Sequence, residues 1–184
     1  MISGEVSLTP DVLIRPVTLD DAAALARAYR RNRAHLEPWD PDRPAPFFTE
    51  QGQADRLRTQ LEEGRAGRSA HWVLVGGGEI LGHAALSNIV LGPVRSANLG
   101  YWIDAGQVGK GLASGAADVV CEAADSQLGL HRVEAGTLLH NTASQRVLTK
   151  CGFEEYGVAP GFLYIQGAWR DHRLFQRILN DRPA

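Results

Sequence analysis

The chain opens with an alternation of apolar and polar residues that predicts a strand. In the stretch DVLIRPVT, residues 11–18, the apolar residues fall on alternating positions, as they do in a strand with one buried face. Four apolar residues then recur at the three- and four-residue spacing of an amphipathic helix: Ala22, Leu25, Ala26 and Tyr29. Thr18 and Asp21 have the Thr-x-x-Asp spacing of a helix start, so we expect a helix over residues 19–33.

A proline-rich segment follows this first helix. Four prolines interrupt the stretch LEPWDPDRPAPFF, residues 36–48: Pro38, Pro41, Pro44 and Pro46. Because proline lacks a backbone donor and restricts the residue before it, this segment is expected to be irregular. Thr49 can then cap a second helix that runs to about Glu63.

The middle of the chain changes to the two-residue period of strands. The runs HWVLV (71–75) and ILGHAALSNIV (80–90) are separated by three glycines at 76–78, which is typical of a hairpin. The next run, SANLGYWI (96–103), predicts a third strand. One face of that strand carries Ala97, Leu99, Tyr101 and Ile103.

Two further helices flank one more strand. Small residues at helical spacing predict a helix over 112–126, and RVEAGTL (132–138) predicts the strand after it. Asn141 is a good capping residue for a helix that continues to Lys150, and Gly152 ends that helix.

The last stretch, FLYIQGAWRDHRLFQRIL (162–179), reads as two strands around a Gln-Gly turn. The element order predicts an α+β domain of mixed α/β type, with a central mixed, mostly antiparallel sheet of about seven strands flanked by helices. No linker divides the chain, so residues 1–184 are interpreted as one domain.

Composition excludes several classes of function. A formal net charge of −2 gives no electrostatic case for nucleic-acid binding, and no apolar run approaches the roughly 20 residues that span a bilayer. The N-terminal residues lack the pattern of a secretory signal. Cys121 and Cys151 have neither metal-binding nor disulfide spacing. We therefore expect a cytoplasmic protein without a metal, either a monomer or a homodimer.

The loop VGKGLAS, residues 108–114, carries the strongest chemical signal. Glycines before a helix N-terminus let backbone N–H groups converge on a phosphate, and Lys110 adds a positive charge. A P-loop is excluded because Gly111 follows Lys110 and position 104 is Asp, and a dinucleotide fingerprint would need glycine at Ser114. From the loop alone, a phosphate site and a simple turn remain equal alternatives.

This loop resembles the pyrophosphate loop of the Gcn5-related N-acetyltransferases, Gln/Arg-x-x-Gly-x-Gly/Ala. Gly111 and Ala113 match the last two defined positions, while Val108 departs from the first. Further stretches resemble the branch that acetylates ribosomal-protein N-termini: NRAHLEPWDP, SNIVLGPVRSANLGYWID, LHRVEAGTLLHNTASQRVLTKCGFEEYG and LYIQGAWRDHRL. The resemblance covers about residues 11–176 and implies the acetyltransferase fold, with acetyl-coenzyme A between two splayed strands.

The resemblance also implies which residues hold the coenzyme. The backbone amides of residues 109–114 would bind the pyrophosphate at the helix N-terminus, and the strand around residues 101–103 would offer backbone groups to the pantetheine arm and acetyl carbonyl. The full expected coenzyme set is Trp102, Ile103, Val108, Gly109, Lys110, Gly111, Leu112, Ala113, Ser114, Asn141 and Ser144. For the side chains of Tyr101 and Trp102, ordinary strand packing is an equal alternative.

Ser144 is the expected catalytic residue that serves the departing thiol. Asn141 and Ser144 form Asn-x-x-Ser at a helix start, and the resemblance places Asn141 against the coenzyme and Ser144 near the sulfur. A thiol has a reference pKa of about 8.5, so protonation by a hydroxyl or by water is feasible. Tyr101 is a second catalytic candidate. Helix capping is the alternative role for Asn141 and is compatible with coenzyme contact.

No strong general base is evident. Some related enzymes carry a glutamate after the last helix, but PGFLY, residues 160–164, has none. The remaining candidates, each more easily explained as structural or surface residues, are His83, His140, Glu154 and Tyr164. A protein α-amine, with a reference pKa of about 7.7–8.0, needs less help from a base than a lysine amine near 10.4.

The acceptor is expected to meet Trp39, Asn88 and Tyr164, with acidic residues near Trp39 attracting its amine; a solvated proline-rich loop is the alternative for that segment. The leading hypothesis is direct acetyl transfer from acetyl-coenzyme A to a protein N-terminus, with a ribosomal protein as a candidate acceptor. A second hypothesis is transfer to a small-molecule amine, amino acid or antibiotic, because fold does not determine the acceptor. A third is a non-catalytic acyl-coenzyme A sensor.

Overall fold

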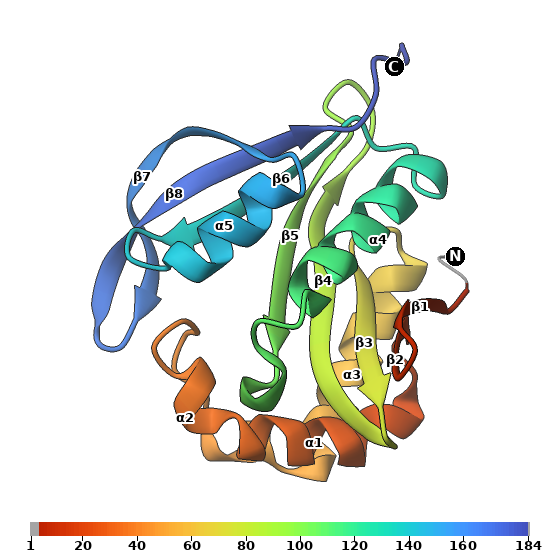
Figure 1. The fold of residues 1–184 in the computed structure, drawn as a ribbon, viewed down its shortest axis with the longest axis vertical. Helices are drawn as coiled ribbons and strands as arrows, with labels where there is room; N and C mark the ends of the chain where they lie inside the picture. Colours follow the sequence, from red (N-terminus) through yellow and green to blue (C-terminus); the bar gives the residue numbers. More distant parts are fainter. Residues whose placement is uncertain (1–3, 184) are drawn as a thin grey trace.

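One eight-stranded sheet organises the protein (Figure 1). The computed structural model describes residues 4–183, and the strands follow the order β1-β2-β3-β4-β5-β6-β8-β7. Their bounds are β1 Val6–Thr9, β2 Val12–Pro16, β3 Ala70–Gly76, β4 Glu79–Val90, β5 Ser96–Ile103, β6 Arg132–Leu138, β7 Glu154–Ile165 and β8 Ala168–Ile178. Every neighbouring pair is antiparallel except β5 and β6, which are parallel.

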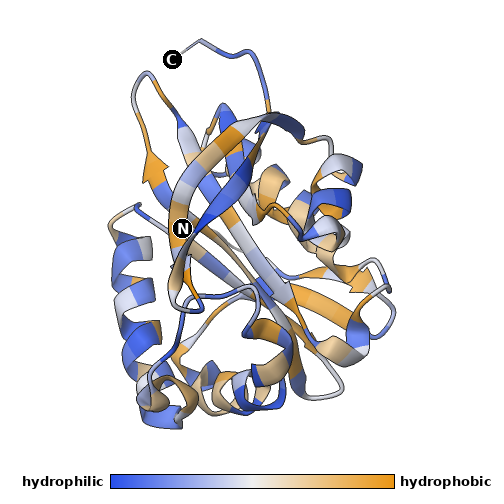
Figure 2. Cartoon of the chain, turned by 90° about the vertical axis from the view of Figure 1, so that its left-hand side faces the viewer, coloured by the Kyte–Doolittle hydropathy of each residue, from blue (hydrophilic) through white to orange (hydrophobic). Residues whose placement is uncertain are grey.

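Helices cover both faces of this sheet. Their bounds are α1 Ala22–Arg31, α2 Arg33–Leu36, α3 Glu50–Arg65, α4 Leu112–Ser126 and α5 Thr142–Lys150, with short 3₁₀ turns at Leu19–Asp21, Ala45–Phe48 and Ala105–Gln107. In Figure 1, α4 and α5 lie in front of the sheet and α3 lies behind it. In Figure 2 the helices carry both hydrophilic and hydrophobic residues, as expected for elements that pack with one side and face solvent with the other.

The parallel contact between β5 and β6 is short. Only Ser96–Asn98 pairs with Arg132–Glu134, although both strands continue beyond these residues. The remaining residues of β5, 99–103, stay paired with β4 on the other side, and the rest of β6 stays paired with β8. The two strands therefore part in the middle of the sheet, as the resemblance predicted.

The predicted helix starts are confirmed at atomic detail. Thr49 Oγ1 accepts a hydrogen bond from the backbone N–H of Gly52 at 3.0 Å, and Asn141 Oδ1 accepts one from the N–H of Ser144 at 3.1 Å. The helix over 112–126 has the predicted bounds. Such caps replace the acceptors that the first turn of a helix lacks, so these residues determine where α3 and α5 begin.

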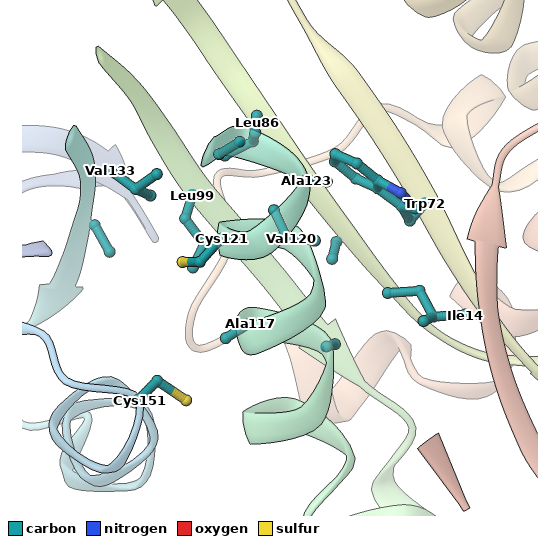
Figure 3. Packing of buried hydrophobic residues seen from close by; sticks show 14 of the residues in the cluster. Ile14, Trp72, Leu86, Leu99, Ala117, Val120, Cys121, Ala123, Val133 and Cys151 are labelled. Carbon is teal, nitrogen blue, oxygen red and sulfur yellow. The ribbon is translucent and has the colours of Figure 1, made fainter. Parts of the chain in front are cut away.

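The larger core lies between the sheet and α4 (Figure 3). Ala117, Val120 and Cys121 of α4 face Leu86 and Leu99 on the strands, and all five are buried. Small side chains on α4 let the helix lie close to the sheet, which places its N-terminus near the strand ends. Both cysteines are free and buried, as expected for core residues.

A smaller core forms on the opposite face, where α1 and α3 pack. Leu25 and Tyr29 of α1 meet Leu57 of α3 and Val73 of β3, and all four are buried. Tyr29 Oη also accepts a hydrogen bond from Trp102 Nε1 at 3.0 Å, so this layer is linked to β5. No helix among residues 4–183 has the length and apolar character needed to cross a membrane.

The structure departs from the sequence expectations in four places. One is β7, which begins at Glu154 and not near Phe162. The sheet has eight strands rather than about seven, because residues 6–9 form a short half-exposed edge strand before the Pro10–Asp11 turn. The helix expected over 19–33 divides into a 3₁₀ turn and α1, which ends at Arg31. The proline-rich segment contains a 3₁₀ turn at Ala45–Phe48, where Pro46 fits the first turn of a helix.

Candidate active site

The glycine loop, residues 108–113, leads into the N-terminus of α4. Gly109 and Gly111 have φ angles of 84° and 79°, in the left-handed region that glycine adopts without steric cost. Nothing lies within 4 Å of a Cβ built on either glycine, and no side chain caps α4. The first-turn N–H groups of α4 lack intrahelical acceptors, so the loop presents donors to open space, where an anion can bind.

A cavity of about 760 Å³ occupies the gap between β5 and β6. On the side of α5 it is lined by Leu99, Tyr101, Thr137, Asn141 and Ser144; on the other side of the sheet it is lined by His83, Trp102 and Glu134. The cavity therefore passes through the sheet where the strands part. A ligand entering from the side of α4 and α5 can meet a second ligand from the opposite side.

Tyr101 and Ser144 form a hydroxyl pair inside this cavity. Tyr101 Oη lies 2.8 Å from Ser144 Oγ and 3.3 Å from the backbone carbonyl oxygen of Ser144. Burial raises the pKa of Tyr101 to about 12, so its hydroxyl stays protonated at neutral pH. The two residues are 43 positions apart in the sequence, and the fold joins β5 to α5 at this point.

Thr137 offers another polar group on the same side. Its Oγ1 is buried and has no hydrogen-bond partner among residues 4–183, although Thr137 lines the cavity. A buried hydroxyl without a partner costs free energy unless a ligand or water satisfies it. The pantetheine arm of coenzyme A carries amides that fit this requirement. The sequence pattern did not single out Thr137.

Glu134 is a carboxylate on the opposite side of the cavity, which Asp40 also lines, and the sequence pattern did not single out Glu134. Val133 and Ala135 pack in the core beneath α4, so strand alternation turns Glu134 to the other face. Its Oε1 accepts hydrogen bonds from Arg132 Nη2 at 2.6 Å and from Tyr156 Oη at 3.0 Å. Both bonds go to Oε1, which leaves Oε2 without a partner in the part of the chain that the structure describes.

His83 lines the same side of the cavity but is a poorer proton acceptor. It is only 5% exposed, and its Nε2 has no hydrogen-bond partner within the described range 4–183. Burial, with a smaller contribution from the positive charge of Arg56, holds the pKa of His83 well below its usual value of 6.5. The ring is therefore neutral at physiological pH and has little tendency to take a proton.

The predicted acceptor residues do not all lie together. Trp39 and Asn88 line the cavity on the side of Glu134. Tyr164 is not among the lining residues; it lies at the end of the β7–β8 hairpin against Trp169, with ring centroids 5.7 Å apart. Phe162 of the same hairpin does line the cavity. Contact of Tyr164 with an acceptor therefore stays a prediction.

The predicted coenzyme residues also separate into groups. Ser144 and Asn141 line the cavity on the side of α5, whereas the side chain of Trp102 points to the layer of α1, where its Nε1 donates to Tyr29 Oη, and Trp102 is paired with His83 of β4. Lys110 Nζ donates to Gln107 Oε1 at 2.9 Å, within reach of the loop. No cluster of three potential metal ligands occurs among residues 4–183.

A split between two central strands, together with a glycine loop at a helix N-terminus, is the arrangement expected of an acyltransferase that uses a coenzyme A thioester. The chain belongs to the acetyltransferase (GNAT) domain family, whose model matches residues 11–154. The [ribosomal protein uS5]-alanine N-acetyltransferase of Escherichia coli is 35% identical over 173 residues, which cover 92% of this chain and 89% of that relative.

Two solved structures extend the similarity. The ribosomal-protein-S5-alanine acetyltransferase of Vibrio fischeri superposes with a TM-score of 0.94 at 33% identity, covering 98% of this chain and 100% of the other. Mycobacterium smegmatis RimJ, solved in complex with CoA-disulfide, superposes with a TM-score of 0.86 at 34% identity. The superposition covers 91% of this chain and 81% of the other. The glycine loop and the cavity found here fit a coenzyme of that kind.

Proposed function

We propose that this enzyme transfers the acetyl group of acetyl-coenzyme A to the N-terminal α-amine of a protein, with a ribosomal protein that begins with alanine as the favoured acceptor. The observation that carries the proposal is the cavity through the sheet, with hydroxyl groups on one side and the Glu134 carboxylate on the other. Relatives that carry this activity in their names align with nearly the whole chain, including the acceptor side.

Coenzyme binding is assigned to the glycine loop and the α5 side of the cavity. Acetyl-coenzyme A supplies an acetyl thioester when bound. The N–H groups of the loop and the first turn of α4 neutralise its pyrophosphate, and Lys110 adds charge nearby. Thr137 Oγ1 and the unpaired backbone groups of β5 offer hydrogen bonds to the arm. Asn141 contributes by fixing the start of α5 beside it.

Glu134 is assigned to the acceptor amine. A carboxylate on this face attracts an ammonium group and accepts its proton, which leaves the neutral amine as nucleophile. The demand on the base is modest, because an α-amine has a reference pKa of about 7.7–8.0 and about a tenth is already neutral near pH 7. A lysine amine, with a reference pKa near 10.4, would require a much stronger base. The site therefore suits a protein N-terminus better.

Tyr101 and Ser144 are assigned to the departing sulfur, as hydrogen-bond donors rather than as a strong acid. A tyrosine with a pKa of about 12 holds its proton more tightly than a thiol with a reference pKa of about 8.5. Complete proton transfer from Tyr101 to the sulfur would therefore be uphill by about 5 kcal/mol. The pair instead stabilises developing negative charge, and water supplies the final proton.

We expect Ser144→Ala and Tyr101→Phe each to lower kcat about tenfold, the value of one lost hydrogen bond of about 1.4 kcal/mol, while coenzyme affinity changes less than about threefold. Thiol release measures kcat and calorimetry measures affinity. A loss of about a thousandfold in either variant would instead indicate a true general acid. An equal fall in turnover and affinity would make Ser144 a binding residue.

Direct transfer without an acyl-enzyme is supported by the two cysteines. Burial raises the pKa of Cys121 to about 12 and also raises that of Cys151, so neither thiol forms the reactive thiolate. Free, buried thiols also suit a reducing compartment, in agreement with the cytoplasmic location expected from the sequence.

The acceptor is tested with a panel of peptides and small amines, each incubated with acetyl-coenzyme A while thiol release is followed. We expect peptides that begin with alanine or serine to react, and blocking the α-amine of the same peptide to abolish the signal. Turnover of small amines alone would replace the protein acceptor by a small-molecule one. Coenzyme binding without any turnover would favour a sensor.

A further inference from the structure

The end of α1 is bonded directly to the turn that precedes the glycine loop. Asn32 follows the last residue of α1 and is 1% exposed. Its Oδ1 accepts a hydrogen bond from the backbone N–H of Ala105 at 2.8 Å, and its Nδ2 donates to Asp104 Oδ2 at 2.8 Å and to the carbonyl oxygen of Ala28 at 2.9 Å. One buried amide thus joins two segments more than 70 residues apart.

Asp104 completes this junction from the other side. It follows the last residue of β5 and precedes the 3₁₀ turn Ala105–Gln107. Its Oδ2 also accepts a hydrogen bond from Arg31 Nε at 2.8 Å, and its Oδ1 accepts one from the N–H of Gly106 at 2.9 Å. Burial by itself would raise the pKa of Asp104, but the hydrogen bonds from Asn32, Arg31 and Gly106 together outweigh burial and hold that pKa below its usual value.

Asn32 also directly precedes the residues that line the cavity on the side proposed for the acceptor. The following residues, 33–43, form what we term the acceptor segment, which contains α2 and contributes Leu36, Trp39 and Asp40 to the cavity lining. The Trp39 ring lies 5.4 Å from the ring of His140, the residue before Asn141. The acceptor segment is therefore tied at Asn32 to the turn before the glycine loop and touches the start of α5 at Trp39.

We propose that Asn32 and Asp104 are positioning residues that couple occupancy of the glycine loop to the order of the acceptor segment. Coenzyme binding restricts the loop, and the junction passes that restriction to residues 33–43, which then present a formed acceptor site. The reverse coupling follows by linkage, because any effect of the coenzyme on acceptor affinity must equal the effect of the acceptor on coenzyme affinity.

The junction is suited to this task because it is buried and fully bonded. If the loop moves, the donors of Asn32 and the carboxylate of Asp104 lose partners that water cannot replace at once, so the two segments move together or not at all. The inference relies on the proposed function only for the identity of the acceptor. Its first test requires coenzyme A alone.

That test is hydrogen exchange of the complete protein with and without saturating coenzyme A. We expect the coenzyme to slow exchange in residues 33–43 at least fivefold in the wild type, in the range typical of coupled sites. Asp104→Asn keeps the size of the side chain but removes its charge, and Asn32→Ala removes the amide altogether. Both variants should bind coenzyme within about threefold of wild type and lose the protection of residues 33–43.

Arg27→Ala is the matched control. Arg27 lies on α1 and pairs with Glu79 of β4 at 3.7 Å, and Glu79 also pairs with Arg31 at 3.4 Å. The variant therefore breaks a neighbouring contact between α1 and the sheet and leaves every hydrogen bond of Asn32 and Asp104 in place. It should retain the protection. If Asn32→Ala does not fold, Asp104→Asn still decides the result. Unchanged exchange in the wild type, or protection that survives in Asp104→Asn, would overturn the inference.

Calorimetry with an alanine-starting peptide and non-transferable coenzyme A gives the second measurement. Peptide affinity should rise at least fivefold in the presence of coenzyme in the wild type and in Arg27→Ala, and by less than twofold in Asp104→Asn. Coenzyme-dependent protection with no peptide binding would contradict the proposed acceptor while supporting the junction. Peptide binding that the coenzyme strengthens equally in all variants would support the proposed acceptor and contradict the role of the junction.

Discussion

Replacing Gly111 with aspartate should abolish coenzyme binding, lowering affinity by at least a hundredfold. Gly111 precedes α4 with a φ of 79°, and open space lies where a side chain would project. An aspartate there puts a negative charge beside the pyrophosphate and also adds bulk to the anion site. Calorimetry with coenzyme A measures the loss.

Gly111→Asn is the control that isolates charge from shape. Asparagine has the size of aspartate, adopts the left-handed region with the same ease and carries no charge. We expect Gly111→Asn to weaken coenzyme binding by about tenfold, because the side-chain amide of asparagine can still donate a hydrogen bond to a phosphate. Both variants should unfold at nearly the same temperature. Affinities of both variants equal to wild type would remove the glycine loop from the coenzyme site.

Glu134→Gln should lower kcat by a factor between about a hundred and ten thousand, the range for loss of a general base, with coenzyme affinity unchanged. Glutamine keeps the shape of the side chain, and its Oε1 can still accept the hydrogen bond from Tyr156. What it cannot do is take a proton from the acceptor amine. Thiol release with an alanine-starting peptide measures the rate.

Two further variants make this result specific. Tyr156→Phe removes one hydrogen bond to Glu134 and leaves the carboxylate, so kcat should fall by less than about tenfold. His83→Gln should have a similarly small effect, because the low pKa of His83 makes it a weak proton acceptor. A severe loss in His83→Gln together with near-normal turnover of Glu134→Gln would reverse the two roles.

Local patterns predicted the elements that we propose hold the coenzyme. The bounds of α4 and the caps at Thr49 and Asn141 depend on residues a few positions apart, so the sequence already contained them. Residues 6–9 escaped notice because a four-residue, half-exposed edge strand leaves almost no period to detect.

Contacts between distant segments could not be predicted in the same way. Glu134 occupies an alternate position of a strand, where a charged residue normally faces water. It becomes part of the site only because β5 leaves β6 directly after the pair of Asn98 with Glu134. The bond between Tyr101 and Ser144 likewise needs the sheet and α5 to be assembled. The carboxylate that we propose as the base therefore lies in β6 and not in PGFLY, residues 160–164.

The short contact between β5 and β6 also affects how the protein holds together. The first five strands are joined in chain order by antiparallel pairing, β6 to β8 form a second group, and the three-residue parallel contact is the only strand pairing between the groups in residues 4–183. The core beneath α4 spans this seam, because Leu99 of β5 and Val133 of β6 both belong to it (Figure 3).

The helix α4, whose N-terminus we propose binds the coenzyme, thus also packs on both groups of strands and holds them together. A ligand that binds only the folded protein adds about 2.7 kcal/mol to its stability at a hundred times its Kd. Because α4 packs on both groups of strands, we expect coenzyme bound at its N-terminus to raise the free energy of unfolding and to make separation of the two groups less frequent.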